Sequence, residues 1–342
     1  MTETILYFLS RFSVKFKVGF IILFLITGIA FWNLSYISMN YGVYENKMTV
    51  STSLEKAREI EELMTLFQEE RRAALNFLYV DHDPEAFEVA AEKTTVKLAS
   101  MQGFMQQCRY EKKRNVIKQT LSRLPSIRQE ILDRKLNGTE AVRFYTDGII
   151  KHLIDIVALM TQQNSSNGFM AYFDIVSGIE YSALEKDLTM AVMGEGIVTE
   201  DLFEVIMIIE GKAQSALDNF RRFAGTTALQ KLYSSYRDGD FVEMNIQKEN
   251  FRNRIFKGNS DIFNLPFWHS TTSTHIRDLR LISDFEYDLL ARQLSREIER
   301  YQMKLYRDVA MLLIPIMIVG LIAYFIFLDI NVALRTMLNF LR

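Results

Sequence analysis

The chain has 342 residues, of which 49% are hydrophobic and 24% are charged, and its formal net charge is −2. Proteins that bind phosphate backbones usually carry a basic excess, so this charge argues against nucleic-acid binding. The single cysteine, Cys108, excludes a disulfide framework, the four histidines have no metal-ligand spacing, and the 15 glycines form no phosphate-binding loop. We therefore expect neither an enzyme nor a bound cofactor.

The first segment of note is an uncharged apolar run, Val18–Tyr36. About 20 apolar residues are enough for a helix to cross a bilayer, so a transmembrane helix is predicted at residues 18–38. A cleaved signal peptide is the alternative, but the run is long for one and no small-residue cleavage site follows it. Basic residues such as Arg11 and Lys15 precede the run, and the positive-inside rule then places residues 1–17 in the cytoplasm.

Residues 39–164 show the three- and four-residue apolar spacing of amphipathic helices. The first of these helices is predicted to end near residue 80, because Asp81–Pro84 is typical of a turn that restarts a helix, and His82 is expected to be a turn residue. Further helices are predicted over about 84–107, 111–122, 126–136 and 139–163, with Pro125 separating the second from the third. Cys108 is expected to be a packed thiol.

A loop-like stretch at residues 164–168 separates this first half from a second half, residues 165–308. The pattern here predicts helices over 168–193, 199–224, 226–236 and 239–257, followed by an irregular segment at 258–266. A last helix is predicted to begin near Trp268 and to continue into the membrane.

The second apolar run, residues 309–328, contains Pro315 but no charged residue, and it predicts a second transmembrane helix. Residues 329–342 then form a short cytoplasmic tail, and residues 45–308 lie outside. The charges that flank the outer end of this run are also basic, so the charge bias is not clean. We expect the two long helices, which join the membrane to the outer bundle, to carry a mechanical signal. The alternative is that they serve only as a stalk.

Three landmarks recur in the two halves at offsets of 115 to 116 residues. Such a constant offset is what a duplicated helical unit leaves in a sequence. The pairs are Glu70-Arg71 with Glu185-Lys186, Phe87-Glu88 with Phe203-Glu204, and Phe104 with Phe220.

The first pair places a cation, Arg71 or Lys186, on the apolar face of a predicted helix in each half. A buried cation is costly unless an anion neutralises it. That anion is either a carboxylate of the chain, with Glu70, Glu180 and Glu185 as candidates, or a small anion from outside. Because the two cations would repel each other, replacing Arg71 by alanine is expected to raise the stability of the ligand-free domain.

Five stretches resemble the nitrate- and nitrite-sensing domain of bacterial chemoreceptors, histidine kinases and antiterminators. They cover about residues 45–300 in the order and spacing of that family. The stretches are Phe67–Leu78, Tyr145–Ile154, Glu180–Lys186, Phe203 with Phe220 and Ala224, and Trp268 with Ile276 and Leu279.

The resemblance implies an all-α fold in which two stacked helical-bundle halves bind nitrate or nitrite through arginines. By motif, that role falls to Arg71, Arg72 and position 186. This chain has Lys186 where arginine is usual and Ala183 where glycine is usual, and lysine keeps the charge but loses the planar fork that matches an oxyanion. Further cations are expected at Arg277 and Arg280, which no motif supports.

The function predicted from these observations is a bacterial inner-membrane receptor whose periplasmic domain, residues 45–308, senses a nitrate-like anion. Both termini are expected in the cytoplasm, with a homodimer as the working form. Residues 329–342 are too few for an output module, so we expect a truncated receptor or a downstream partner. The alternative is a membrane-anchored helical scaffold whose outer bundle binds another protein, which large exposed apolar patches would favour.

Overall fold

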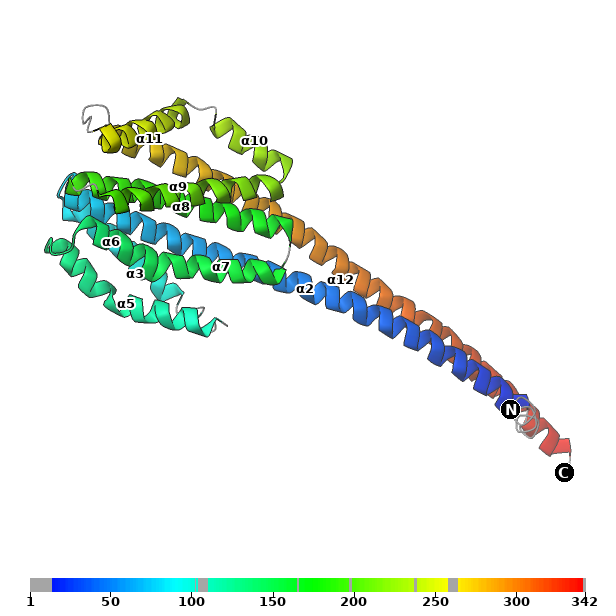
Figure 1. Ribbon diagram of the computed structural model, residues 1–342. Coiled ribbons are helices and arrows are strands. Elements are labelled where there is room, and N and C mark those ends of the chain that lie inside the picture. The colour runs from blue at the N-terminus through cyan, green and yellow to red at the C-terminus, as the bar shows by residue number, and fades with distance from the viewer. Residues whose placement is uncertain are drawn as a thin grey trace, which may run out of the picture. The chain divides into compact units, whose positions relative to one another are not determined.

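The computed structural model describes residues 14–101, 103, 110–164, 166–196, 199–236, 239–257 and 264–340, and these residues form helices without any strand. The expected all-α class is thus confirmed for this part of the chain. The elements in order are α2 (Val14–Tyr79), α3 (Pro84–Ser100), α5 (Glu111–Leu132), α6 (Gly138–Tyr145), the π-helical turn η1 (Thr146–Ile150), α7 (Lys151–Asn164), α8 (Asn167–Glu195), α9 (Glu200–Phe223), α10 (Thr226–Ser235), α11 (Gly239–Lys257) and α12 (Leu265–Phe340) (Figure 1).

Most boundaries follow the local signals in the sequence. The side chains of Asn137, Ser166 and Thr199 cap α6, α8 and α9, as expected for polar residues at a helix start. His82 is a turn residue as predicted, with φ 56° and its Nδ1 3.0 Å from the carbonyl oxygen of Phe77. The helix predicted over 84–107 ends earlier, at Ser100, where Met101 is its C-cap. The expected packing of Cys108 lies outside the described residues.

Pro125 does not divide two helices as predicted, because α5 runs through it. Proline removes one backbone hydrogen bond from a helix interior. The side chains of Leu124, Ile127 and Ile131 are buried on the same helix, so packing holds the segment helical across the proline. The prediction failed because it weighed a local signal without the tertiary contacts that oppose it.

The described chain divides into two compact units. Unit 1 comprises residues 1–51 and 293–342, and unit 2 comprises residues 52–292. Within unit 2, α8 packs against α9 on one side and against α6 and α7 on another (Figure 1). The two predicted halves therefore share one compact unit, in which α8 has neighbours from both.

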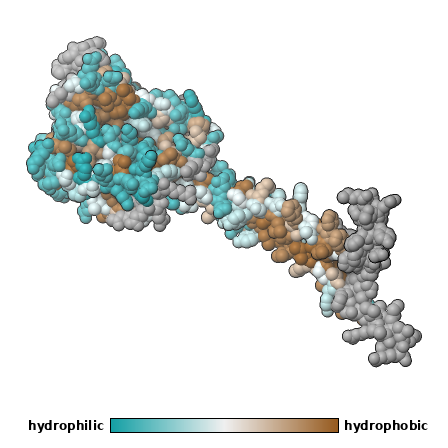
Figure 2. Space-filling view, turned by 60° about the horizontal axis from the view of Figure 1, so that its bottom comes forward, coloured by the Kyte–Doolittle hydropathy of each residue, from teal (hydrophilic) through white to brown (hydrophobic). Residues whose placement is uncertain are grey.

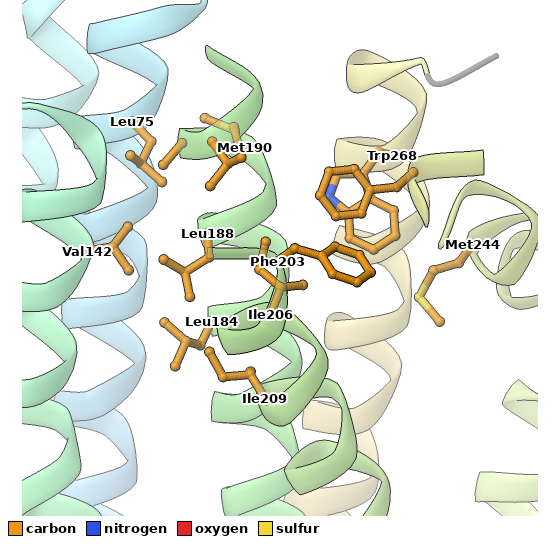
Figure 3. Close-up of a cluster of buried hydrophobic side chains, with 13 residues drawn as sticks. Leu75, Val142, Leu184, Leu188, Met190, Phe203, Ile206, Ile209, Met244 and Trp268 are labelled. Atoms are coloured by element: carbon orange, nitrogen blue, oxygen red, sulfur yellow. The ribbon is translucent and has the colours of Figure 1, made fainter. Parts of the chain in front are cut away.

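An apolar core crosses the predicted halves inside unit 2 (Figure 3). Leu75 of α2 and Val142 of α6 belong to the same cluster as Leu188 of α8, Phe203 of α9 and Trp268 of α12. Trp268 is only 2% exposed, and burying an aromatic ring of this size contributes strongly to stability. The core thus fixes α2, α8 and α12 against one another, and these helices carry the site residues described below.

Tyr79, the last residue of α2, packs tightly against two glycines. A Cβ atom at Gly138 would lie 2.4 Å from Cε2 of Tyr79, and one at Gly194 would lie 2.5 Å from its Cγ. The Tyr79 hydroxyl accepts a hydrogen bond from the backbone N–H of Gly138 at 2.6 Å and donates to Glu195 at 3.0 Å. Glycine is therefore required where the start of α6 and the end of α8 approach this ring.

In unit 1, α2 and α12 form a pair with polar contacts between them. Nδ2 of Asn40 donates to Oδ2 of Asp308 at 2.8 Å, and Nζ of Lys304 donates to Oδ1 of Asn40 at 3.0 Å. A separate ion pair joins Lys47 of α2 to Glu297 of α12 at 2.7 Å. Asn40 and Asp308 are buried where they meet. The three buried or half-buried groups at Asn40 therefore satisfy one another.

Many large apolar side chains are exposed on the described surface of unit 1, where Figure 2 shows brown patches. Among the described residues, α12 is the one helix long and apolar enough to cross a membrane. The predicted span at 309–328 lies within α12, and the predicted span at 18–38 lies within α2. The structure thus supports one of the two predicted spans, and the first remains a prediction.

Candidate anion-binding site

Arg71 lies on the inward face of α2, and its side chain is 0% exposed. Its guanidinium group contacts η1 and α8. Nε donates to Oδ2 of Asp187 at 2.6 Å, whereas Nη1 donates to Oε1 of Glu180 at 2.9 Å and to Oγ1 of Thr146 at 2.7 Å. The predicted burial of Arg71 between helices of the two halves is therefore confirmed.

The remaining guanidinium nitrogen of Arg71, Nη2, is buried and has no hydrogen-bond partner among the described residues. Leaving a buried donor without an acceptor costs about 1–3 kcal/mol, and more when the donor is charged. Burial by itself lowers the pKa of Arg71, but the nearby carboxylates of Glu180 and Asp187 raise it by a larger amount. The pKa of Arg71 therefore lies above its ordinary value. Arg71 is thus a permanent cation with one donor open to a ligand.

From the sequence alone, Arg71 is expected to be destabilising in the ligand-free domain, because the other predicted cation repels it. The ion pairs of Arg71 contradict that expectation. Two buried carboxylates, Glu180 and Asp187, face its positive charge. Removing one partner of a buried ion pair destabilises a protein strongly because the other charge is left unpaired. Replacing Arg71 by alanine is therefore expected to lower stability, opposite to the expectation from the sequence.

Glu180 was one of three candidate counterions, but Asp187 was missed. The two residues are seven positions apart on α8, which is about two helical turns, so both project from one face. That face is otherwise apolar, and two acids at this spacing are the signal that identifies a partner for a buried arginine. Thr146 carried no comparable signal, because its position depends on the π-helical turn.

Lys186, the second predicted cation, is 2% exposed. Its Nζ donates to Oγ of Ser273 on α12 at 2.9 Å. Burial lowers the pKa of Lys186 to about 8, and repulsion from Arg72, Arg280 and Arg71 adds to this effect, although Asp187 opposes it. The structure therefore brings four of the predicted cations into one electrostatic cluster.

Arg280 of α12 connects this cluster to the Arg71 ion pairs through Gln68. Nη2 of Arg280 donates to Oε1 of Gln68 at 2.8 Å, and Nε2 of Gln68 donates to Oε2 of Glu180 at 2.6 Å. Burial lowers the pKa of Arg280, with repulsion from Arg72 contributing, and Glu69 opposes the shift. Its Nε is buried without a hydrogen-bond partner among the described residues, so Arg280 also retains an open donor.

Two further groups face the cluster. Arg72 is half-buried and has no hydrogen-bond or ion-pair partner in the part of the chain that the structure describes. Burial and repulsion from Lys186 and Arg72 lower the pKa of His269 to about 4, so its imidazole is neutral at pH 7. The Nε2 atom of His269 is buried and unpartnered among the described residues. No motif or spacing in the sequence pointed to His269.

Arg277 is not brought into this cluster. It is exposed on α12, whereas Arg280, three residues later, is half-buried and faces Gln68. Arg277 is also absent from the charges that act most strongly on Lys186. The structure thus gathers Arg71, Arg72, Lys186 and Arg280, and leaves Arg277 at the solvent-exposed surface.

The other two candidate counterions have partners of their own. Glu70 accepts hydrogen bonds from Arg128 of α5 at 2.7 and 2.8 Å and from the Tyr145 hydroxyl at 2.7 Å. Glu185 accepts from Lys248 of α11 at 2.8 Å. Each buried glutamate therefore pairs with a cation from a later helix, and neither neutralises the cluster.

A family model described as nitrate and nitrite sensing matches residues 62–291. No curated protein matches the chain. A solved structure titled "Structure of the NasR transcription antiterminator" matches with a TM-score of 0.65 and 14% identity over 82% of this chain and 81% of that chain, a likeness that shows the fold alone. The family match covers more than half of the sequence and includes both Arg71 and Lys186, and the chain therefore belongs to the nitrate and nitrite sensing family.

Proposed function

We propose that this chain is the sensory part of a transmembrane receptor that binds nitrate or nitrite at the cluster of Arg71, Arg72, Lys186 and Arg280. The open Nη2 of Arg71 carries the proposal, because it is a fully buried, charged donor that lacks an acceptor. A planar oxyanion supplies such acceptors and adds the negative charge that the cluster needs. The family match supports the choice of ligand.

The cluster joins three helices that belong to different parts of the fold. Arg71 and Arg72 are on α2, Lys186 is on α8 and Arg280 is on α12. An anion among them screens the repulsion that lowers the pKa of Lys186, and so favours states in which the three helices approach one another. A ligand shifts a conformational equilibrium only through such a difference in affinity.

The helices that carry these cations continue toward the predicted membrane spans. α2 extends from Val14 to Tyr79 and α12 from Leu265 to Phe340, each as one helix. We propose a bacterial inner-membrane location with both termini in the cytoplasm and residues 45–308 in the periplasm. The proposal includes a homodimer and a cytoplasmic output partner, and a sensory rather than a catalytic role.

The test is calorimetric titration of sodium nitrate and sodium nitrite into the full chain in lipid nanodiscs. Lys186→Gln and Arg72→Gln should weaken binding by about tenfold or more, because a charged hydrogen bond contributes about 1.5–3 kcal/mol. Arg222→Gln is the matched control, since Arg222 is exposed on α9. Wild-type affinity in both site variants would contradict the proposal.

A complementary variant restores the usual residue of the family. Lys186→Arg should tighten nitrate binding by up to about fivefold, because arginine adds a planar pair of donors where lysine already supplies the charge. A scaffold that binds another protein through its bundle would show no response of this kind. Unchanged or weaker nitrate binding in Lys186→Arg would argue against a bidentate contact at this position.

A further inference from the structure

A cavity lies in unit 2 between the α6–η1–α7 segment and α9, over one face of α8. Its volume is about 370 Å³, within the size range of sites for small molecules. Its walls are mostly apolar, and four of the side chains in Figure 3 belong to them. The apolar part of the lining includes Val142, Leu184, Leu188, Val205, Ile208 and Ile209.

The charges of this cavity favour an anionic group at its opening. Arg143, Lys151 and Lys212 belong to the lining, are exposed, and form no ion pair with a carboxylate of the described residues. Nζ of Lys212 instead lies 5.7 Å from the centre of the Tyr181 ring. Exposed cations next to an apolar chamber match a ligand that has a negative end and an apolar body.

The acidic groups of the lining do not cancel this excess. Glu180 is paired with Arg71, and Asp155 is paired with Lys113. Asp147 is the remaining acid, exposed and without an ion-pair partner among the described residues. Three unpaired cations against one unpaired acid leave a net positive opening.

We infer that this cavity binds an amphipathic organic anion, namely a small carboxylate with an aromatic or aliphatic body. Nitrate itself does not suit the chamber, because a small, fully polar ion gains nothing from apolar walls and loses its hydration there. Arg72, Lys186 and Arg280 are not part of the lining, so this site is distinct from the nitrate site.

The π-helical turn η1 forms part of the cavity wall. π-helical turns are rare and occur frequently at functional sites. η1 supplies Thr146 and Asp147 to the lining, and Oγ1 of Thr146 also accepts from Nη1 of Arg71. Glu180 likewise belongs to both the cavity and the Arg71 ion pairs. A carboxylate in the cavity therefore changes nitrate affinity, and this coupling, unlike the binding itself, rests on the proposed function.

The probe is sodium 4-phenylbutyrate, titrated calorimetrically into the full chain in nanodiscs without nitrate, with empty nanodiscs as the blank. We expect saturable binding of one molecule per chain. Two related compounds should bind at least about fivefold more weakly than phenylbutyrate. These are 4-phenylbutanol, which lacks the negative charge, and propionate, which lacks the large apolar group. Absence of saturable binding, or equal affinity for the alcohol, would overturn the inference.

Variants locate the site. Val205→Trp places an indole in the cavity from the surface of α9, where Val205 is 41% exposed, and should weaken phenylbutyrate binding more than tenfold. Val116→Trp is the matched control, because Val116 is 40% exposed on α5 outside this lining. Lys212→Gln should weaken binding about two- to fivefold, the range of one exposed charge, while Lys118→Gln should have no effect.

Nitrate titration of the same variants separates this inference from the proposed function. Loss of phenylbutyrate binding in Val205→Trp with retained nitrate binding shows that the protein is folded and supports a separate cavity site. Full phenylbutyrate affinity in Val205→Trp would overturn the inference whatever nitrate does. A change of oligomeric mass in that variant, with phenylbutyrate binding unaltered, would identify this face as a contact between copies and would overturn it too.

Discussion

The nitrate binding proposed for this chain should weaken as the pH rises through 8, because Lys186 loses its charge there. Burial and the neighbouring Arg72 and Arg280 lower the pKa of Lys186 to about 8. If only the charged form binds nitrate, the apparent Kd scales with one plus the ratio of neutral to charged lysine. That factor is about 1.1 at pH 7 and about 11 at pH 9, so affinity falls about tenfold over this interval.

The assay is a nitrate titration at pH 7, 8 and 9 at constant ionic strength, since salt also screens the cluster. Lys186→Arg should give a flat profile, because arginine stays charged across this range. Lys118→Arg, an exchange at an exposed position of α5, should keep the wild-type slope. A flat wild-type profile, or the same slope in Lys186→Arg, would refute the role assigned to Lys186.

Three further outcomes are expected. Arg71→Ala should lower the free energy of unfolding by about 3–5 kcal/mol in denaturant titrations, because Glu180 and Asp187 lose their counterion, and a higher melting temperature would contradict this. Gly138→Ala should destabilise by about 1–3 kcal/mol in the same assay, because its Cβ overlaps the Tyr79 ring, and unchanged stability would show that the ring moves freely. Reporter fusions at residue 160 and at the C-terminus should report opposite compartments, whereas equal compartments would mean that one apolar run does not span.

The stability of the ligand-free domain should respond to pH in the opposite direction to nitrate affinity. The pKa of Lys186 is about 8 in the folded chain and 10.5 ordinarily, so between these values the unfolded chain binds more protons. The free energy of unfolding therefore rises with pH in this window. Lys186→Arg should abolish the rise in thermal melts recorded from pH 8 to 10, and a rise that persists in this variant would assign it to other groups.

The helical fold was predictable from the sequence because most helix ends carry local signals. Ser166 and Thr199 cap α8 and α9 within one residue of the predicted starts. Two departures from the predicted helices depend on packing. Pro125 remains inside α5 because its neighbours are buried, and the single helix predicted over 139–163 contains the π-helical turn η1, which no periodicity reveals.

The site was predictable only where burial and charge conflict in the sequence. Arg71 and Lys186 stood out because a cation on an apolar face needs a partner, and both are buried. Asp187 was missed although its seven-residue spacing from Glu180 was a signal, because acids on helices are common and the role of this one depends on which face of α8 meets α2. The position of His269 could not be predicted, because the contact between α8 and α12 depends on tertiary packing.

The polar contact at Asn40 restricts how α2 and α12 of unit 1 can move. Its hydrogen bonds to Asp308 and Lys304 join the two helices at one level. Sliding α12 along α2 by one residue, about 1.5 Å, would stretch both bonds and leave buried groups unpaired, at about 1–3 kcal/mol for each group. Tilting both helices together keeps the bonds intact. The pair therefore favours movements that both helices share over the displacement of one helix past the other.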